Sequence, residues 1–141
     1  MSGETFVTDL RVRFADVDNA GIVYYPRFFH FFHVAMEELF EREFGKNYPD
    51  VIGVDHVGFP AVHTEADYRM PVRYGDRPHV RVTCIRLGGR SVTLRYRVTR
   101  PADGAEFAEG RITTACVDMR TFTPMDVPPT YREFFSRFLE S

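Results

Sequence analysis

Hydrophobic residues recur along the middle of the chain with the period of a helix. From Pro26 to about Gly45 the apolar positions are spaced three and four residues apart, which is typical of an amphipathic helix. These positions are Phe28, Phe31, Phe32, Ala35, Met36, Leu39, Phe40 and Phe44. Pro26 suits the first turn of this helix, and Gly45 suits a left-handed C-terminal cap. We therefore expect one long helix with a broad apolar face.

Strand patterns lie on both sides of this helix. Before it, Val12 and Phe14 alternate with Arg11 and Arg13, as in a half-buried strand that leads straight toward the helix. After it, we expect a loop from 47 to 58. Four segments with strand character follow, at 61–69, 79–87, 91–100 and 106–119.

Turn signals order these strands. Gly88-Gly89 predicts a tight hairpin and residues 101–104 predict a longer turn, so we expect the last three strands to form an antiparallel meander. Near the end, Tyr131, Phe134, Phe135 and Phe138 follow Pro128-Pro129 with helical spacing. This pattern predicts a short helix packed on a sheet edge or on a neighbouring subunit.

These elements predict an α+β fold in which an antiparallel sheet wraps around one long central helix. The length of 141 residues is that of one domain. A single sheet on one helix leaves open strand edges and an apolar flank, so we expect the chain to associate with itself.

Composition excludes several classes of protein. Hydrophobic residues make up 44% of the chain and the net charge is only -2, which argues against disorder and against nucleic-acid binding. Cys84 and Cys116 lie in apolar strand segments and are expected to be buried free thiols. We find no signal peptide and no run long enough to span a membrane, so we expect a cytoplasmic protein without membrane contact.

The candidate chemistry is that of a carboxylate. The serines are Ser2, Ser91, Ser136 and Ser141, and none lies in a G-x-S-x-G nucleophile elbow. The cysteines lack the basic or helix-start setting that would lower a thiol pKa. Asp18 remains, because it stands where the first strand gives way to the helix.

The start of a helix offers unpaired N–H groups to developing negative charge. Pro26 has no N–H, so the amide of Tyr25 is the natural first donor toward a carbonyl, and Asp18 would act as nucleophile or general base. By local chemistry alone, Asp18 is more often a turn former than a catalyst. We expect Asp16 to be an exposed acid at a strand end and Asn19 to be a turn residue.

Residues 16–26 read Asp-Val-Asp-Asn-Ala-Gly-Ile-Val-Tyr-Tyr-Pro. This segment resembles the signature D-x-D-x-x-G-[IV]-[VF]-[WYF]-[YH] of the 4-hydroxybenzoyl-CoA thioesterase family of hotdog-fold enzymes, and the likeness covers nearly the whole chain. The resemblance implies a single hotdog thioesterase domain over residues 1–141. It also implies that Asp18 is the catalytic carboxylate, that the position of Tyr25 polarises the thioester carbonyl, and that active sites lie between subunits of a homodimer or homotetramer.

The substrate implied by this resemblance is an acyl-CoA or an acyl-carrier-protein thioester, with no separate cofactor. Phe29, His33 and Gly58 are the candidate residues for the acyl group, and an aromatic or a short to medium apolar acyl group would suit the phenylalanines. His33 replaces a residue that is often acidic in the family, which argues against a 4-hydroxybenzoyl group. Arg86 and Arg90 flank the Gly88-Gly89 turn and are the candidates for the CoA phosphates.

Several alternatives remain open at this stage. His30, His33, Glu37 and Glu41 form one stripe on the helix, which is either a metal site or an ordinary polar face. A non-catalytic acyl-CoA sensor would use the same fold without turnover. A hotdog hydratase or dehydratase would need His30 or His33 as its essential base.

Overall fold

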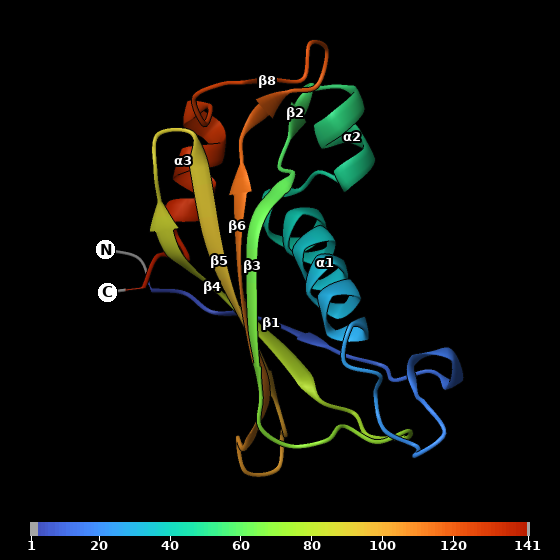
Figure 1. Ribbon diagram of the computed structural model, residues 1–141. Coiled ribbons are helices and arrows are strands. Elements are labelled where there is room, and N and C mark those ends of the chain that lie inside the picture. Colours follow the sequence, from blue (N-terminus) through green and yellow to red (C-terminus); the bar gives the residue numbers. More distant parts are fainter. Residues whose placement is uncertain (1–2, 141) are drawn as a thin grey trace.

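The computed structural model describes residues 3–140, and a curved antiparallel sheet wraps around helix α1 (Figure 1). The elements in chain order are β1 (Phe6–Asp9), a 3-10 turn (Phe14–Asp16), α1 (Arg27–Leu39) with a π-helical continuation (Phe40–Phe44), α2 (Tyr48–Gly53), β2 (Val57–Gly58), β3 (Ala61–Tyr68), β4 (His79–Leu87), β5 (Ser91–Thr99), β6 (Glu106–Ala115), β7 (Val117–Asp118), β8 (Thr123–Pro124) and α3 (Pro129–Ser136). The main sheet has the order β1-β4-β5-β6-β3, and β2, β7 and β8 form a smaller sheet.

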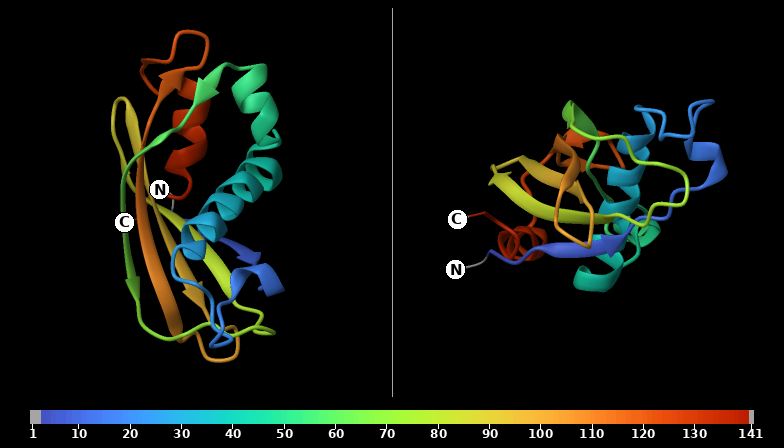
Figure 2. Two further views of the ribbon diagram at one scale, coloured as in Figure 1. Left: turned by 45° about the vertical axis from the view of Figure 1, so that its right-hand side comes forward. Right: turned by 90° about the horizontal axis from the view of Figure 1, so that it is seen from below.

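The central helix and the meander are confirmed. Gly45 ends the helical segment with a φ of 75°, and β4, β5 and β6 are consecutive antiparallel neighbours. Figure 2 shows α1 lying against the concave side of the sheet. No helix among residues 3–140 combines the length and the apolar character needed to cross a membrane. The architecture is that of the expected hotdog fold, with α1 in the centre.

The prediction of a strand around 11–14 is wrong. β1 lies earlier, at Phe6–Asp9, and the chain bends into a 3-10 turn where Phe14 is 79% exposed. The carboxylate of Asp16 causes this bend, because its Oδ2 accepts a hydrogen bond from the Arg13 N–H at 2.7 Å. The prediction that Asp16 is exposed is also wrong, since it is buried.

The segment 47–58 is not the predicted loop. Asn47 caps the N-terminus of α2, where its side chain accepts a hydrogen bond from the Asp50 N–H, and Pro49 lies in the first turn. β2 follows and pairs with β7. The predicted strand 106–119 is correspondingly divided into β6 and β7, which belong to different sheets. α2 and the small sheet build one end of the molecule, where they border the cavity described below.

The predicted C-terminal helix is confirmed as α3. It buries Tyr131, Phe134 and Phe135 against its own chain, and the ring of Phe40 lies within 5.3–6.3 Å of all three rings. Both cysteines are buried free thiols, as expected. The large aromatic cluster shows that the far end of α1 belongs to the core.

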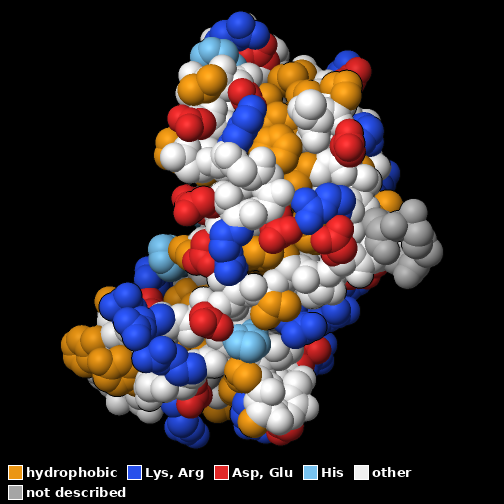
Figure 3. Space-filling model, turned by 180° about the vertical axis from the view of Figure 1, so that it is seen from behind, with side chains coloured by type: hydrophobic (Ala, Val, Ile, Leu, Met, Phe, Trp, Pro, Cys, Tyr) orange, Lys and Arg blue, Asp and Glu red, His pale blue; other side chains and the backbone are white. Residues whose placement is uncertain are grey.

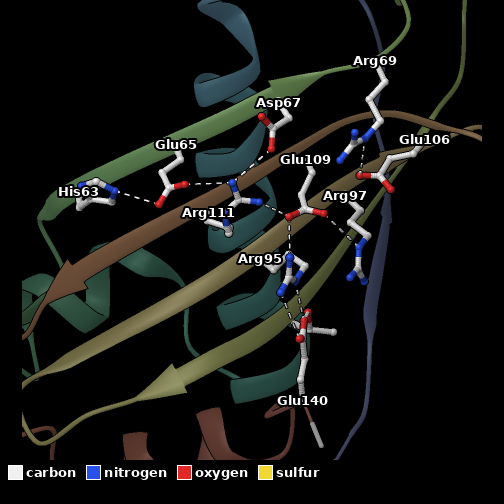
Figure 4. Close-up of polar contacts among 11 residues, drawn as sticks. His63, Glu65, Asp67, Arg69, Arg95, Arg97, Glu106, Glu109, Arg111 and Glu140 are labelled. Carbon is white, nitrogen blue, oxygen red and sulfur yellow. Dashed lines mark hydrogen bonds and ion pairs between the residues drawn. The ribbon is translucent and has the colours of Figure 1, made fainter.

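Charged side chains cover the convex face of the sheet. Figure 4 shows a ladder in which Arg111 pairs with Glu65 and Glu109, and Arg95 pairs with Glu109 and Glu140. Although burial opposes ionisation of Glu109, the two arginines hold its pKa below the ordinary value. This face is thus polar and internally paired, which leaves the sheet edges as the surfaces open to association.

Candidate active site

Asp18 lies in a tight turn just before the helix. The turn is closed by the Gly21 N–H, which donates to the Asp18 carbonyl at 2.9 Å, and Gly21 takes a φ of 77° there. Asp18 Oδ1 accepts a hydrogen bond from the Ala20 N–H at 2.8 Å, and the side chain is exposed. It borders an open hollow of about 680 Å³, together with Phe14 and Tyr74. The carboxylate is therefore accessible, and one of its oxygens orders its own turn.

A partly buried ion pair fixes this turn to the helix. Arg27, the first residue of α1, donates to Asp16 Oδ1 from Nε at 3.0 Å and from Nη2 at 2.7 Å. The Tyr24 N–H donates to the Asp16 carbonyl at 2.9 Å. Asp16, which the sequence suggested to be an unremarkable surface acid, is thus the anchor that positions the loop of Asp18 beside the helix start.

We predict that Asp16→Asn destabilises the protein by about 2 kcal/mol, because the variant weakens a charge-assisted pair on a buried side chain while Arg27 is partly exposed. Urea unfolding followed by circular dichroism measures the change. The control is Asp118→Asn, which alters a partly exposed pair with Arg120 and should shift the unfolding midpoint much less, because asparagine still accepts the hydrogen bond from the Arg120 N–H. Equal midpoints for Asp16→Asn and the unmodified protein would contradict an anchoring role.

The helix start has the unpaired donor that the sequence suggested. The Tyr25 N–H donates no hydrogen bond to any residue among 3–140, whereas the next two backbone donors, of Arg27 and Phe28, bond to Tyr24 and Tyr25. The Tyr25 ring is 61% exposed and contacts the ring of Tyr68 at 6.1 Å. The geometry thus leaves one N–H without a partner among residues 3–140 at the positive end of the helix dipole.

Exposed aromatic side chains gather at this end of the molecule. Phe14, Tyr24, Tyr25, Tyr68 and Tyr74 are 45–79% exposed. Figure 3 shows a group of hydrophobic side chains projecting at the surface of this end of the molecule. Large aromatic rings rarely stay uncovered in such a group on a monomeric protein. This surface is the flank for which we expected a partner.

Phe29, His33 and Gly58 come together in one cavity. It has a volume of about 460 Å³ and lies between α1, α2, β2 and the strands β3 and β6. Apolar side chains dominate its wall, including Met36, Ile52, Phe59, Ile112 and Met119. Phe29 and His33 lie one turn apart on α1, and Gly58 comes from β2, so the convergence of the helix face with this strand fits an acyl pocket.

Position 58 needs a glycine because the smaller sheet packs closely around it. A Cβ at this position would lie 2.2 Å from Met119 Sδ and 3.3 Å from Val117 Cγ2.

His33 Nε2 lies 2.9 Å from Glu37 Oε2, so an acidic neighbour orients the imidazole at the cavity wall. No three residues of the His, Cys, Asp and Glu types within 3–140 form a group that could hold a metal ion.

Arg86 and Arg90 lie elsewhere. Both flank the tip of the β4–β5 hairpin, which in Figure 1 lies at the opposite end of the sheet from the segment 14–25. Arg90 is paired with Asp126 at 2.9 Å, and Arg86 is exposed. Neither arginine borders the cavity or the hollow beside Asp18. In one protomer these candidates for the CoA phosphates are therefore separated from Asp18.

Within one protomer the predicted catalytic residues and the predicted acyl-pocket residues form two separate groups. Asp18 and Tyr25 lie at the start of α1, and the cavity with His33 and Gly58 lies beyond them along the helix. Sequence reasoning missed Tyr96 and all of α2, which supply further cavity wall. The Asn47-x-Pro49 capping signal would have revealed α2. Tyr96 gave no signal beyond its alternation in a strand.

Two proteins of similar sequence are named as hydrolases of an aryl-CoA ester. A 1,4-dihydroxy-2-naphthoyl-CoA hydrolase of Prochlorococcus marinus is 32% identical over 95 residues, which cover 63% of this chain and 61% of that protein, less than two thirds of its length. A 1,4-dihydroxy-2-naphthoyl-CoA hydrolase of Synechocystis sp. is 26% identical over 126 residues, which cover 88% of this chain and 91% of that protein.

Solved structures share the fold. A thioesterase superfamily protein from Jannaschia sp. superposes with a TM-score of 0.90 at 24% identity, covering 97% of this chain and 94% of that one. A gentisyl-coenzyme A thioesterase superposes with a TM-score of 0.79 at 25% identity, covering 90% and 99%. The family model of the thioesterase-like superfamily matches residues 12–135. This match includes the Asp18 turn, the central helix and most of α3, and the chain therefore belongs to the thioesterase-like superfamily.

Proposed function

We propose that the protein is an acyl-CoA thioesterase that hydrolyses an acyl-CoA with an aromatic or a short to medium apolar acyl group to the free acid and CoA. Asp18 attacks the thioester or activates water, and the Tyr25 N–H polarises the carbonyl. The observation that carries the proposal is the apolar cavity shared by Phe29, His33 and Gly58, in a chain of the thioesterase-like superfamily. The relatives named as hydrolases of aryl-CoA esters support the same substrate class.

We also propose that a complete site forms between two protomers. β3 is an edge strand in which Val62 and Tyr68 are exposed. Ala61, at its first residue, borders the cavity, whereas Tyr68, at its last, contacts Tyr25. These ends are far apart in one protomer, because an eight-residue strand is roughly 25 Å long.

Antiparallel pairing of β3 with its copy removes this separation. The Tyr68 end of one strand then lies beside the Ala61 end of the other, so the helix start of one protomer faces the cavity of its partner. The pairing also covers the exposed edge and part of the aromatic flank. A homodimer with two shared sites is the assembly that this strand geometry favours.

A thiol-release assay with DTNB across benzoyl, short-chain and medium-chain acyl-CoAs tests the activity. We expect turnover to be highest for aryl or medium apolar groups and to fall for long chains that exceed the cavity. The protein thiols should not disturb the assay, because burial raises the pKa of Cys84 and Cys116 to about 11 and leaves about one thiolate per thousand at pH 8. Binding of acyl-CoA without release of CoA would instead support a sensor.

A hydratase is the second candidate, and the His33–Glu37 pair beside the cavity favours it. A histidine oriented by a carboxylate can remove or deliver a proton on an enoyl thioester. In that case His33→Ala would abolish hydration of an enoyl-CoA and Asp18→Ala would not. No hydration by the unmodified protein removes this candidate.

A further inference from the structure

Tyr96 is a buried phenol in the wall of the acyl cavity. It lies in the middle of β5, is 2% exposed, and borders the cavity together with His33 and Ile112. No residue among 3–140 forms a hydrogen bond with its hydroxyl group, whose oxygen is not fully enclosed by protein and faces the cavity. Burial raises the pKa of this phenol far above its ordinary value, so the group is a neutral O–H donor.

The surrounding sequence fixes the ring in place. Gly110 is the direct cross-strand neighbour of Tyr96, and a Cβ on Gly110 would lie 2.3 Å from the ring of Phe32. The glycine therefore leaves room for Phe32, which stacks on Tyr96 with ring centres 5.1 Å apart and an interplanar angle of 24°. A rigid aromatic pair thus holds the phenol against the cavity.

A ligand that fills the cavity covers this hydroxyl, which then needs a partner on the ligand. A phenylalanine would fill nearly the same volume without needing a partner. Two other polar groups of the cavity wall do have partners, because Thr114 Oγ1 donates to the Val92 carbonyl at 3.2 Å and His33 pairs with Glu37. The Tyr96 hydroxyl, in contrast, is a donor available to a ligand.

We propose that the Tyr96 hydroxyl donates a hydrogen bond to an oxygen atom carried by the acyl group, and so selects oxygenated acyl groups over unsubstituted ones. The inference rests on the proposed function, since it takes the cavity as the acyl pocket. A site built to hydrogen-bond a substrate discriminates strongly against an analogue that leaves its polar group unpaired. An acyl group that is apolar throughout would leave Tyr96 without a partner.

The test compares benzoyl-CoA with its three monohydroxylated isomers in the unmodified protein and in Tyr96→Phe. We expect the unmodified protein to prefer one hydroxylated isomer, and the ratio of its kcat/KM to that of benzoyl-CoA to fall by about 10- to 100-fold in Tyr96→Phe. The melting temperature of Tyr96→Phe should be unchanged, because the hydroxyl forms no hydrogen bond to the protein and faces the cavity.

Tyr131→Phe is the matched control. Tyr131 is equally buried, but its hydroxyl already donates to Asp55 at 2.6 Å and does not border the cavity. This variant should lower the melting temperature and leave the substrate ratio as it is. An unchanged ratio in Tyr96→Phe, or an equal loss for all four esters, overturns the role of Tyr96 while the thioesterase activity stands.

Calorimetric binding of the free acids separates the two proposals. If the unmodified protein hydrolyses neither the four esters nor the short-chain and medium-chain acyl-CoAs, the proposed function fails. Selective binding of a hydroxybenzoate over benzoate, lost in Tyr96→Phe, would still support the donor role. Equal binding of the acids by both proteins would overturn it.

Discussion

Asp18→Asn is expected to lower kcat for the best acyl-CoA by about 100- to 10,000-fold, because the amide can neither attack a thioester nor accept a proton from water. KM should change little, since the acyl group is held by the cavity that contains Phe29 and Gly58. Stability should not change, because Asp18 is exposed and asparagine can accept the same hydrogen bond from the Ala20 N–H. Steady-state kinetics and thermal unfolding measure both effects.

Asp103→Asn is the matched control for this variant. Asp103 is also an exposed carboxylate, and its Oδ1 accepts a hydrogen bond from the N–H two residues later, at 3.0 Å. It lies in the β5–β6 turn and borders neither the cavity nor the hollow beside Asp18. The control should retain full activity. Near-native turnover by Asp18→Asn would rule out both forms of attack by this residue.

Much of the fold could be predicted because its periodic segments are long. The three- and four-residue spacing of phenylalanines in α1 leaves little choice of structure, and β4 begins and ends where its alternation predicts. The errors fall where side-chain hydrogen bonds override the pattern. Asp16 turns the chain out of its strand path by binding the Arg13 N–H, and Asn47 starts a helix of only six residues.

The site was harder to predict than the fold. The resemblance supplied Asp18 and Tyr25, because a short motif holds the turn, the unpaired N–H and the helix start together. The cavity depends on contacts between distant segments of the chain. Tyr96 borders the cavity and stacks on Phe32, and neither contact could be recognised from the sequence. The alternation of a strand predicts that an inward-facing tyrosine belongs to the core, whether or not its hydroxyl group has a partner.

Ala66→Pro should convert the protein to a monomer and remove most of its activity. The Arg69 N–H donates to Phe107, so the alternate residues of β3, including Ala66, direct their N–H groups away from β6 and toward the open edge. Proline at position 66 therefore keeps the bonds to β6 and removes a donor needed for pairing with a second β3. Light scattering after size exclusion, combined with the thiol-release assay, measures both losses.

Ala66→Ser keeps the N–H and should remain a fully active dimer. Sharing of the site is tested by mixing Asp18→Asn with Ile112→Trp, which fills the cavity. Each variant alone should be nearly inactive. Mixed dimers carry one intact site if Asp18 of one protomer serves the cavity of the other, so refolding an equal mixture should restore about a quarter of the unmodified activity. No recovery, with mixed dimers present, would mean that each protomer builds its own site.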